Sequence, residues 1–280
     1  MDNLLQDVRY GLRTLLRQPG FAATAILTLA LGIGATTAIF SVVNAVVLRP
    51  LPFDQPDRVM YVTNRNLKTG NRNTTISGPD FFDWRAQSRG FEVLSYFTGA
   101  GETSVTVNNV SDYTAVARVA PGYFEVFGAT ARTGRLFTRE EQQPGGSDAV
   151  VISEAYWRRQ FASDARAIGS TITFGQRTRT IIGVTALRYP ARTDIYYPDP
   201  VAPESQSRTA HNYRGVGRLA TGVSVVQAQS EMTGIASRLE QQYPVSNINQ
   251  GVRVDPLLDS MVGGSRPVVM LLAGDRKSVV

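Results

Sequence analysis

The feature that most constrains this chain is an uncharged segment near its beginning, residues 18–48, which lies between Arg17 and Arg49. Its central part, Ala25 to Val43, holds nine Leu, Ile, Phe or Val residues and no ionisable side chain. A helix of about 20 apolar residues crosses the hydrocarbon core of a bilayer, and these side chains favour insertion. The sequence therefore predicts a transmembrane helix over residues 20–48.

Two other interpretations of this segment are open. A cleaved signal peptide has an apolar core of about 7–15 residues and then a small-residue cleavage site. Here the nearest such site, Val43-Asn44-Ala45, lies inside a longer apolar run. The second alternative is a buried helix of a soluble protein, although the segment offers no polar face. Both alternatives fit the segment less well than a membrane span.

Small residues recur along one face of the predicted span. Ala30, Gly34 and Ala38 are four residues apart, so in a helix they share a face. Small side chains at this spacing let a second membrane helix approach closely. We expect this face to pack against another membrane helix, although small residues are also common in membrane helices without such a role.

An amphipathic helix is predicted over residues 1–19, before the span. Leu4, Val8, Leu12 and Leu15 recur at helical spacing, and three arginines supply the polar face. This pattern is typical of a helix at a membrane surface, and a short helix packed on protein is the alternative. Arginines lie on both sides of the span, so the positive-inside rule only weakly favours a cytoplasmic N-terminus.

Composition excludes several kinds of site. The chain of 280 residues has a formal charge of +6, no cysteine and one histidine, His211. Thiolate chemistry is therefore absent, and a zinc site would need carboxylates in addition to His211. The arginines are scattered, and no basic motif is interleaved with aromatic residues, so we do not expect nucleic-acid binding.

The remainder of the chain, residues 50–265, alternates strand-like and helix-like segments in the manner of an α+β domain. Helices are predicted after Ser77, Pro121, Ser153 and Ser224, each with a capping or start signal. Ser77 with Asp80 and Ser224 with Gln227 have the spacing of capping boxes, and the helix after Ser224 has one apolar face, made of Ala228, Met232, Ile235, Leu239 and Tyr243. Gly175-Gln176 between two alternating arms predicts a hairpin. Further strands are predicted over residues 58–64, 91–97, 103–107, 113–119, 149–152, 213–219 and 251–257.

No catalytic constellation is present. The chain lacks a phosphate-binding G-x-x-x-x-G-K-[ST] loop, and Ser153 lacks the flanking glycines of a nucleophile elbow. The carboxylate pairs Asp80/Asp83 and Glu140/Glu141 are explained by helix capping and by a solvated helix start. We therefore predict no catalytic residue, no cofactor, no metal site and no enzymatic activity.

Several segments together resemble a known family. The run LALGIGATTAIFSVVNAVVLRPLPF is similar to the first membrane helix of ABC-transporter permeases with a MacB-like periplasmic core domain, which are related to FtsX-like permeases. RVAPGYFEVFG, GRLFTREE, VVISEAYWRRQF, IGSTITFGQRTRTIIGV and GRLATGVSVVQAQSEM resemble this family in the same order. The resemblance extends from the N-terminal helix to Ala273.

The resemblance implies a function and a topology. In this family a cytoplasmic ATPase subunit or domain hydrolyses ATP, and the membrane helices pass the motion to a periplasmic domain that acts in export or efflux. The resemblance implies a bacterial inner-membrane location, a cytoplasmic N-terminus, and contacts with lipid, with other membrane helices and with a periplasmic partner protein. It also implies two lobes in the domain 50–265: residues 57–120 with 205–260, and an inserted lobe, residues 121–204.

One departure from the family concerns the end of the chain. Residues 267–274 resemble the start of a second membrane helix, but the apolar run stops after Ala273, too short for a span. We therefore expect a C-terminally truncated fragment of a permease. The alternative function is that of a single-span, membrane-anchored extracytoplasmic domain that binds a ligand or a protein.

Overall fold

A computed structural model describes residues 19–43, 53–99, 101–143, 145–146, 148–190, 192–199 and 207–262. The chain divides into two compact units, residues 51–261 and a unit made of residues 1–50 and 262–280. Each unit is considered by itself. The predicted amphipathic helix over residues 1–18, the end of the predicted span over residues 44–48, and residues 267–274 lie outside the described residues.

Helix α2, Pro19–Val43, covers most of the predicted span. Its hydroxyl groups are satisfied locally, since Thr24 Oγ1 donates to Gly20 O at 2.9 Å and Thr28 Oγ1 donates to Thr24 O at 2.8 Å. In the part of the chain that the structure describes, no helix combines the length and the apolar character that a membrane crossing takes.

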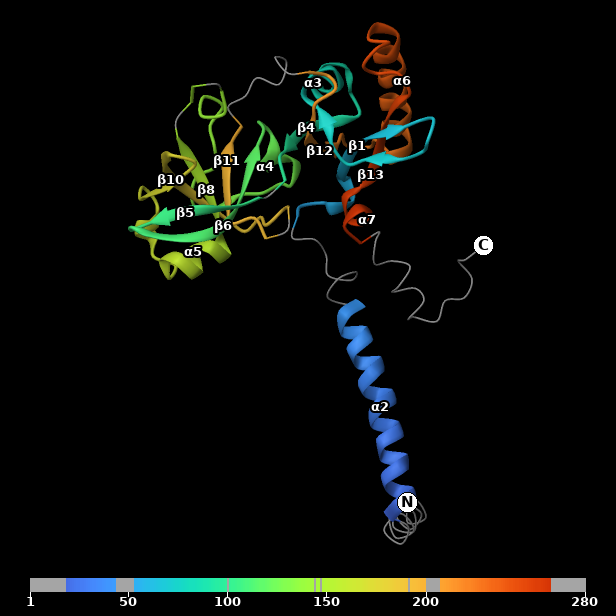
Figure 1. Cartoon of the computed structure of the whole chain (residues 1–280), viewed down its shortest axis with the longest axis vertical. Coiled ribbons are helices and arrows are strands. Elements are labelled where there is room, and N and C mark those ends of the chain that lie inside the picture. Colours follow the sequence, from blue (N-terminus) through green and yellow to red (C-terminus); the bar gives the residue numbers. More distant parts are fainter. Residues whose placement is uncertain are drawn as a thin grey trace. The chain divides into compact units, whose positions relative to one another are not determined.

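The larger unit contains a four-stranded antiparallel sheet, which we call the sheet region. Its strand order is β4 (Phe91–Phe97), β12 (His211–Leu219), β1 (Val59–Asn66) and β13 (Gln250–Pro256). The short strands β2 (Arg72–Asn73) and β3 (Ile76–Ser77) pair with β1 and β12. Figure 1 shows helix α6 alongside β13 and β1. Strands from both ends of the unit therefore form one sheet.

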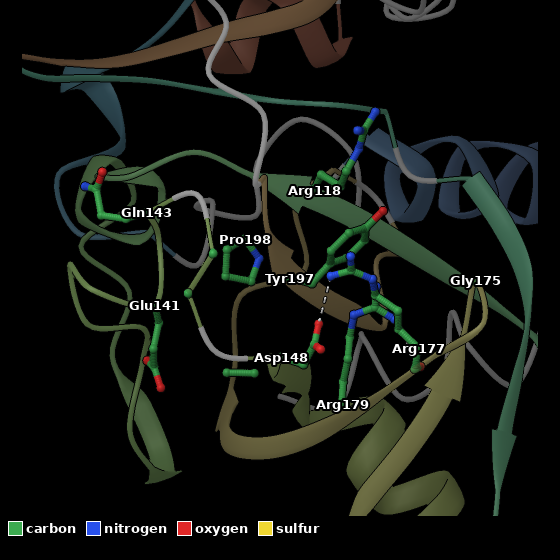
Figure 2. Close-up of a pocket in the computed structure, with 12 residues that line it drawn as sticks. Arg118, Glu141, Gln143, Asp148, Gly175, Arg177, Arg179, Tyr197 and Pro198 are labelled. Carbon is green, nitrogen blue, oxygen red and sulfur yellow. Dashed lines mark hydrogen bonds and ion pairs between the residues drawn. The ribbon is translucent and has the colours of Figure 1, made fainter.

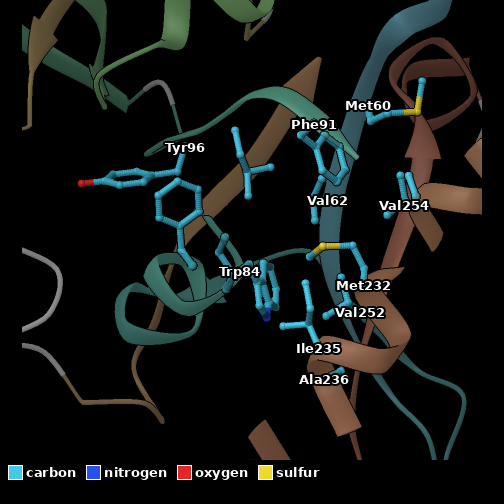
Figure 3. Packing of buried hydrophobic residues seen from close by; sticks show 14 of the residues in the cluster. Met60, Val62, Trp84, Phe91, Tyr96, Met232, Ile235, Ala236, Val252 and Val254 are labelled. Atoms are coloured by element: carbon cyan, nitrogen blue, oxygen red, sulfur yellow. The ribbon is translucent and has the colours of Figure 1, made fainter. Parts of the chain in front are cut away.

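Helices α3 (Gly78–Gln87) and α6 (Val225–Gln242) cover this sheet. Helix α6 begins with the predicted capping box, in which Ser224 Oγ accepts from Gln227 N and Gln227 Oε1 accepts from Ser224 N. Its apolar face packs Met232 and Ile235 against Trp84 of α3 and the strands (Figure 3). This periodic face explains why α6 was recognised from the sequence.

A six-stranded closed barrel forms the second part of the unit, the barrel region. Its order is β11 (Ile195–Pro198), β8 (Ala149–Ser153), β10 (Arg177–Thr185), β9 (Thr171–Phe174), β5 (Gly101–Val107) and β6 (Val110–Val119). The ring closes because β11 pairs with both β8 and β6. Buried Val, Ile and aromatic side chains fill its core together with Tyr156 of α5 (Glu154–Phe161).

An aromatic cluster joins the two regions. Phe97 of β4 and Val216 of β12 pack with Tyr123 and Phe124 of helix α4 (Tyr123–Val126) and with Tyr196 of β11. The regions are also joined directly, because Phe97 pairs with Val119 of β6. The remaining elements are β7 (Ala131–Gly134), α7 (Leu257–Val262) and the short helices η2 (Pro56–Arg58) and η3 (Ala165–Ala167).

The structure confirms the mixed helix and strand content, and it departs from the expected elements in places. Strand β11 and helix α7 were not predicted from the sequence. Residues 101–119, which the family resemblance places in the same lobe as residues 57–97, pair with β9 and β11 of the segment 121–204. Asp80 does not complete a capping box, because its carboxylate contacts Arg208 and Asn247 instead.

Candidate functional site

The polar side chains that were considered as candidates from the sequence make hydrogen bonds within the fold. Ser153 Oγ caps α5 by accepting from Tyr156 N at 3.1 Å. The ring nitrogens of His211 lie 3.3 Å from Asn64 Nδ2 and 3.0 Å from Asn73 Nδ2, so the histidine joins β1 and β2 to β12. Among the described residues, no group of histidines and acidic side chains is arranged to hold a metal ion.

The predicted packing residues Ala30, Gly34 and Ala38 lie on α2. Ala30 and Gly34 are exposed, and a Cβ atom added at Gly34 would meet nothing within 4 Å. The side chain of Ala38 lies outside the described part of the chain. The structure brings no second helix to this face within its described residues, so the packing role stays a prediction.

An arginine-lined pocket of about 250 Å³ lies in the barrel region of the larger unit (Figure 2). We call it the arginine pocket. One wall is formed by β10, β6 and β11, which supply Arg177, Arg179, Arg118 and Tyr197. Glu141 and Gln143 lie on the other side of the pocket (Figure 2), and the remaining lining residues are Gly145, Gly146, Asp148, Ala149, Gly175 and Pro198. Its volume is slightly below the range of about 300–1,000 Å³ that is usual for small-molecule pockets.

The hairpin that carries two of these arginines was predicted from the sequence. Gly175 and Gln176 have φ angles of 57° and 61°, the left-handed values that a type I′ turn needs at both central positions. Arg177 and Arg179 then follow on β10 two residues apart, so both side chains leave the same face of the strand. Figure 2 shows both side chains beside Tyr197.

Arg179 is half-buried, and two aromatic rings hold it. Its guanidinium carbon lies 3.9 Å from the centroid of the Phe174 ring and 5.2 Å from that of Tyr197. Its Nη1 donates to Phe174 O at 2.7 Å and to Arg177 O at 3.3 Å. Cation–π contacts and hydrogen bonds to carbonyl groups orient a guanidinium group but do not neutralise its charge.

The other two arginines of the pocket each have a carboxylate partner. Arg177 Nη1 lies 3.5 Å from Asp148 Oδ1, and Arg118 Nη1 lies 3.7 Å from the buried Asp199. Across the pocket, Glu141 accepts two hydrogen bonds of 2.7 Å from Arg135. Among the described residues, no carboxylate lies within ion-pairing distance of Arg179.

The pKa of Arg179 is consistent with the lack of an ion-paired carboxylate among the described residues. Burial lowers it below the usual arginine value, and Asp148 opposes the effect only in part. In Arg135 the hydrogen bonds that the guanidinium donates to Glu141 raise the pKa instead. Arginine stays protonated at any physiological pH. The pocket therefore contains one half-buried positive charge that no carboxylate of the described chain neutralises.

The wall opposite the arginines is held in place by its own contacts. Thr138 N donates to Glu141 Oε2 at 2.9 Å, and Gly146 N donates to Gln143 O at 2.9 Å. Gly146 approaches so closely that an added Cβ would lie 2.5 Å from Glu141 O. This close approach to the backbone of Glu141 requires glycine.

A second cleft of about 660 Å³ lies beside β4. It is lined by Phe91, Val93 and Leu94 of that strand, by the Pro121-Gly122 turn, and by polar residues of α3 and of the segment 139–143. Its charged side chains are of both signs. The cleft therefore shows no preference for the charge of a ligand.

Sequence reasoning missed the arginine pocket. The arginines were interpreted as scattered, and by sequence position they are, because Arg118 lies on β6 and Arg177 and Arg179 lie on β10. One signal was available, since the predicted hairpin places two arginines at alternate positions directly after its turn. The absence of an acid partner for Arg179 depends on contacts across the barrel, which no local pattern reveals.

Three solved structures resemble the fold of this chain. The first is a domain of a protein from Porphyromonas gingivalis that is described as a permease (TM-score 0.57, 17% identity, 74% of this chain and 92% of the other). The second is the periplasmic region of MacB from Actinobacillus actinomycetemcomitans (0.55, 16%, 75% and 92%). The third is the extracellular domain of the noncanonic ABC-type transporter YknZ from Gram-positive bacteria (0.52, 15%, 70% and 99%). At these identities the likeness shows the fold.

The family follows from the sequence itself. None of the curated proteins matches the chain. The sequence profile of the MacB-like periplasmic core domain, however, matches residues 22–235, which is well over half of the chain. This match confirms the resemblance drawn from the sequence motifs. The chain belongs to the MacB-like periplasmic core domain family of ABC-transporter permeases.

Proposed function

We propose that this chain is the permease component that couples ATP hydrolysis by a cytoplasmic ATPase subunit or domain to movement of an extracytoplasmic domain, for export or efflux. Family membership supports the permease assignment. The observation that carries the coupling is the pairing of β1 with β13, the first and last strands of the larger unit. A periplasmic partner protein would receive the movement.

The two strands join the ends of the domain. Their register runs from Met60 opposite Pro256 to Asn66 opposite Gln250. The chain therefore enters the sheet at Val59 and leaves it after Pro256 at the same end. A displacement of the flanking segments at this end would act on both strands together.

The pair is firmly attached to the rest of the sheet region. Gln229 of α6 donates to Val252 O at 2.9 Å and accepts from Val254 N at 2.9 Å, so both polar atoms of one side-chain amide join the helix to the strand. Arg253 and Asp255 form a further ion pair at 2.6 Å on β13. The sheet region would therefore move as one body when its ends are displaced.

The membrane part of the proposal rests on the sequence. We place a transmembrane helix at residues 20–48, with a cytoplasmic N-terminus in the inner membrane and the larger unit on the periplasmic side. Ala30, Gly34 and Ala38 would pack against other membrane helices of the permease. Catalysis belongs to the ATPase in this scheme, and the chain itself would turn over no substrate.

The absence of cysteine makes the coupling directly measurable. Phe21→Cys on α2 and Val245→Cys, at a side chain that is 93% exposed, give one spin-label pair in an otherwise unlabelled chain. The chain is purified with its partner ATPase, and the distance distribution is measured without nucleotide and with trapped ATP. We expect the distribution to shift when ATP is bound.

A second label pair separates two kinds of movement. Val110→Cys and Val245→Cys both lie on the larger unit, so a change in this pair reports a movement between the barrel and sheet regions. A change in the first pair alone indicates movement as one body. If ATP changes the distance distribution of neither pair, in a complex that hydrolyses ATP, coupling through this chain is refuted.

The alternative, an anchored extracytoplasmic binding domain without a transport role, is favoured by one observation, the arginine pocket. The two functions differ in the need for an ATPase. A chain that co-purifies with no ATPase and binds a ligand in this pocket would fit the alternative and contradict the permease proposal.

A further inference from the structure

We propose that the arginine pocket binds the phosphoryl group of an anionic ligand, through Arg179 and Arg177. The proposal does not depend on the transport function, because it rests on the geometry of one pocket in the barrel region. The phosphoryl group is the shared chemistry of two sources, free phosphate and the head group of an anionic phospholipid.

The first step is the unbalanced charge of Arg179. Its guanidinium group is half-buried, its pKa is lowered by burial, and the carboxylates of the pocket are engaged elsewhere. Partial burial of a cation that is not paired with a carboxylate is unfavourable, and an anion can compensate it. An anion entering the pocket would supply the missing partner.

The second step is the orientation of the side chain before any ligand arrives. Phe174 and Tyr197 hold the guanidinium plane, and Phe174 O fixes one of its amino groups. Little side-chain entropy is then lost on binding, which favours affinity. An exposed arginine without such contacts would lose more.

The third step selects a phosphoryl group over a carboxylate. One guanidinium fork satisfies a carboxylate, whereas a phosphoryl group offers three or more acceptor oxygens in a tetrahedral arrangement. Arg177 and Arg179 leave β10 on the same face and line the same small pocket. Two guanidinium forks from alternate positions of one strand suit the larger number of acceptors.

The fourth step concerns Asp148, which is the natural competitor. Its contact with Arg177 is loose at 3.5 Å, and both side chains are about half exposed or more, at 48% and 65%. Such pairs contribute little stability. A phosphoryl group can therefore displace Asp148 from Arg177, and removal of the Asp148 charge should strengthen binding.

The test measures binding of inorganic phosphate to the full chain by isothermal titration calorimetry at low ionic strength. We expect Arg179→Gln to weaken binding by about tenfold or more, because it removes charge-assisted hydrogen bonds. Arg177→Gln should weaken it less, and Asp148→Asn should strengthen it. Arg166→Gln, at a side chain that is 92% exposed and paired with Asp164, is the matched control and should leave the affinity unchanged.

Two kinds of result would overturn the proposal. The first is that the wild-type chain does not bind phosphate, and the second is that Arg179→Gln and Asp148→Asn both bind as the wild type does. The opposite signs expected for these two substitutions guard against a folding defect, since a damaged protein does not gain affinity. Unfolding midpoints without phosphate verify that each variant is folded.

A second arm distinguishes the sources of the phosphoryl group. Co-flotation of the chain is compared between vesicles of phosphatidylglycerol and phosphatidylcholine, for the wild type and for Arg179→Gln. Selective loss of phosphatidylglycerol binding in the variant identifies a lipid head group, and phosphate binding without any effect on vesicles identifies a free phosphate. If sodium acetate binds as tightly as phosphate in the titration, the selection of a phosphoryl group is wrong.

Discussion

Two arginines, one in each region of the larger unit, stack on aromatic rings and yet differ in their surroundings. Arg208 lies in the sheet region, 3.5 Å above the Tyr243 ring, and Arg179 lies in the barrel region, 3.9 Å from the Phe174 ring. Arg208 contacts two carboxylates, Asp80 at 2.8 Å and Asp83 at 2.7 Å. Arg179 contacts none among the described residues.

The pKa values move in opposite directions for this reason. Burial alone lowers the pKa of either arginine, but the contacts with Asp83 and Asp80 outweigh it at Arg208 and raise the pKa. At Arg179 the effect of burial prevails. A cation with its own counterions stabilises the fold, whereas a cation without them is available to a ligand. This difference separates a structural arginine from a binding one.

The largest expected effect is that of Arg208→Met. The substitution leaves Asp80, whose side chain is only 5% exposed, next to Asp83 without a cation. Uncompensated buried carboxylates are strongly unfavourable, and we expect a loss of about 3 kcal/mol in the free energy of unfolding. Denaturant unfolding of the full chain measures it. A loss below about 1 kcal/mol would mean that Arg208 is not a structural residue.

A matched pair of acidic substitutions should give the next largest effect. Asp80→Asn removes a carboxylate that accepts from Arg208 and from Asn247 Nδ2, at 2.9 Å, and should cost about 2 kcal/mol. Asp148→Asn breaks only the loose, exposed pair with Arg177 and should cost less than about 0.5 kcal/mol. Comparison of the two unfolding midpoints measures the difference. Equal losses would show that the two regions use their ion pairs alike.

The sequence predicted the features that depend on neighbouring residues. Ser224 and Gln227 form the expected capping box, and Gly175-Gln176 forms the expected hairpin turn. Both signals are local, because the residues that make the contact are adjacent or three apart. The apolar face of α6 was recognised on the same basis, because apolar residues three or four positions apart indicate one face of a helix.

Features that depend on distant residues were missed. Asp80 was interpreted as half of a capping box, and Asp80 N does donate to Ser77 Oγ, but the carboxylate of Asp80 accepts from Arg208, which is 128 residues away. Strand β11 contains only four residues, in a proline-rich stretch, and it is defined by its pairing with β6 and β8. The arginine pocket was missed for the same reason, since β6, β10 and β11 meet only in the barrel.

The smallest expected effect on stability is that of Arg179→Met, and it sharpens the comparison most. The methionine keeps an apolar contact with Phe174 and removes a half-buried charge that no carboxylate of the described residues pairs with. The lost hydrogen bond to Phe174 O and the relieved burial of charge oppose each other. We therefore expect the free energy of unfolding in phosphate-free buffer to stay within about 0.5 kcal/mol of the wild type.

The same variant should differ from the wild type once phosphate is added. A ligand that binds only the folded state raises the unfolding midpoint in proportion to the logarithm of its concentration above Kd. The wild type should therefore be stabilised by phosphate, and Arg179→Met should not, whereas an Arg166→Met control should respond as the wild type does. A loss near that of Arg208→Met in phosphate-free buffer would instead make Arg179 a structural residue, and the distinction between the two arginines would be lost.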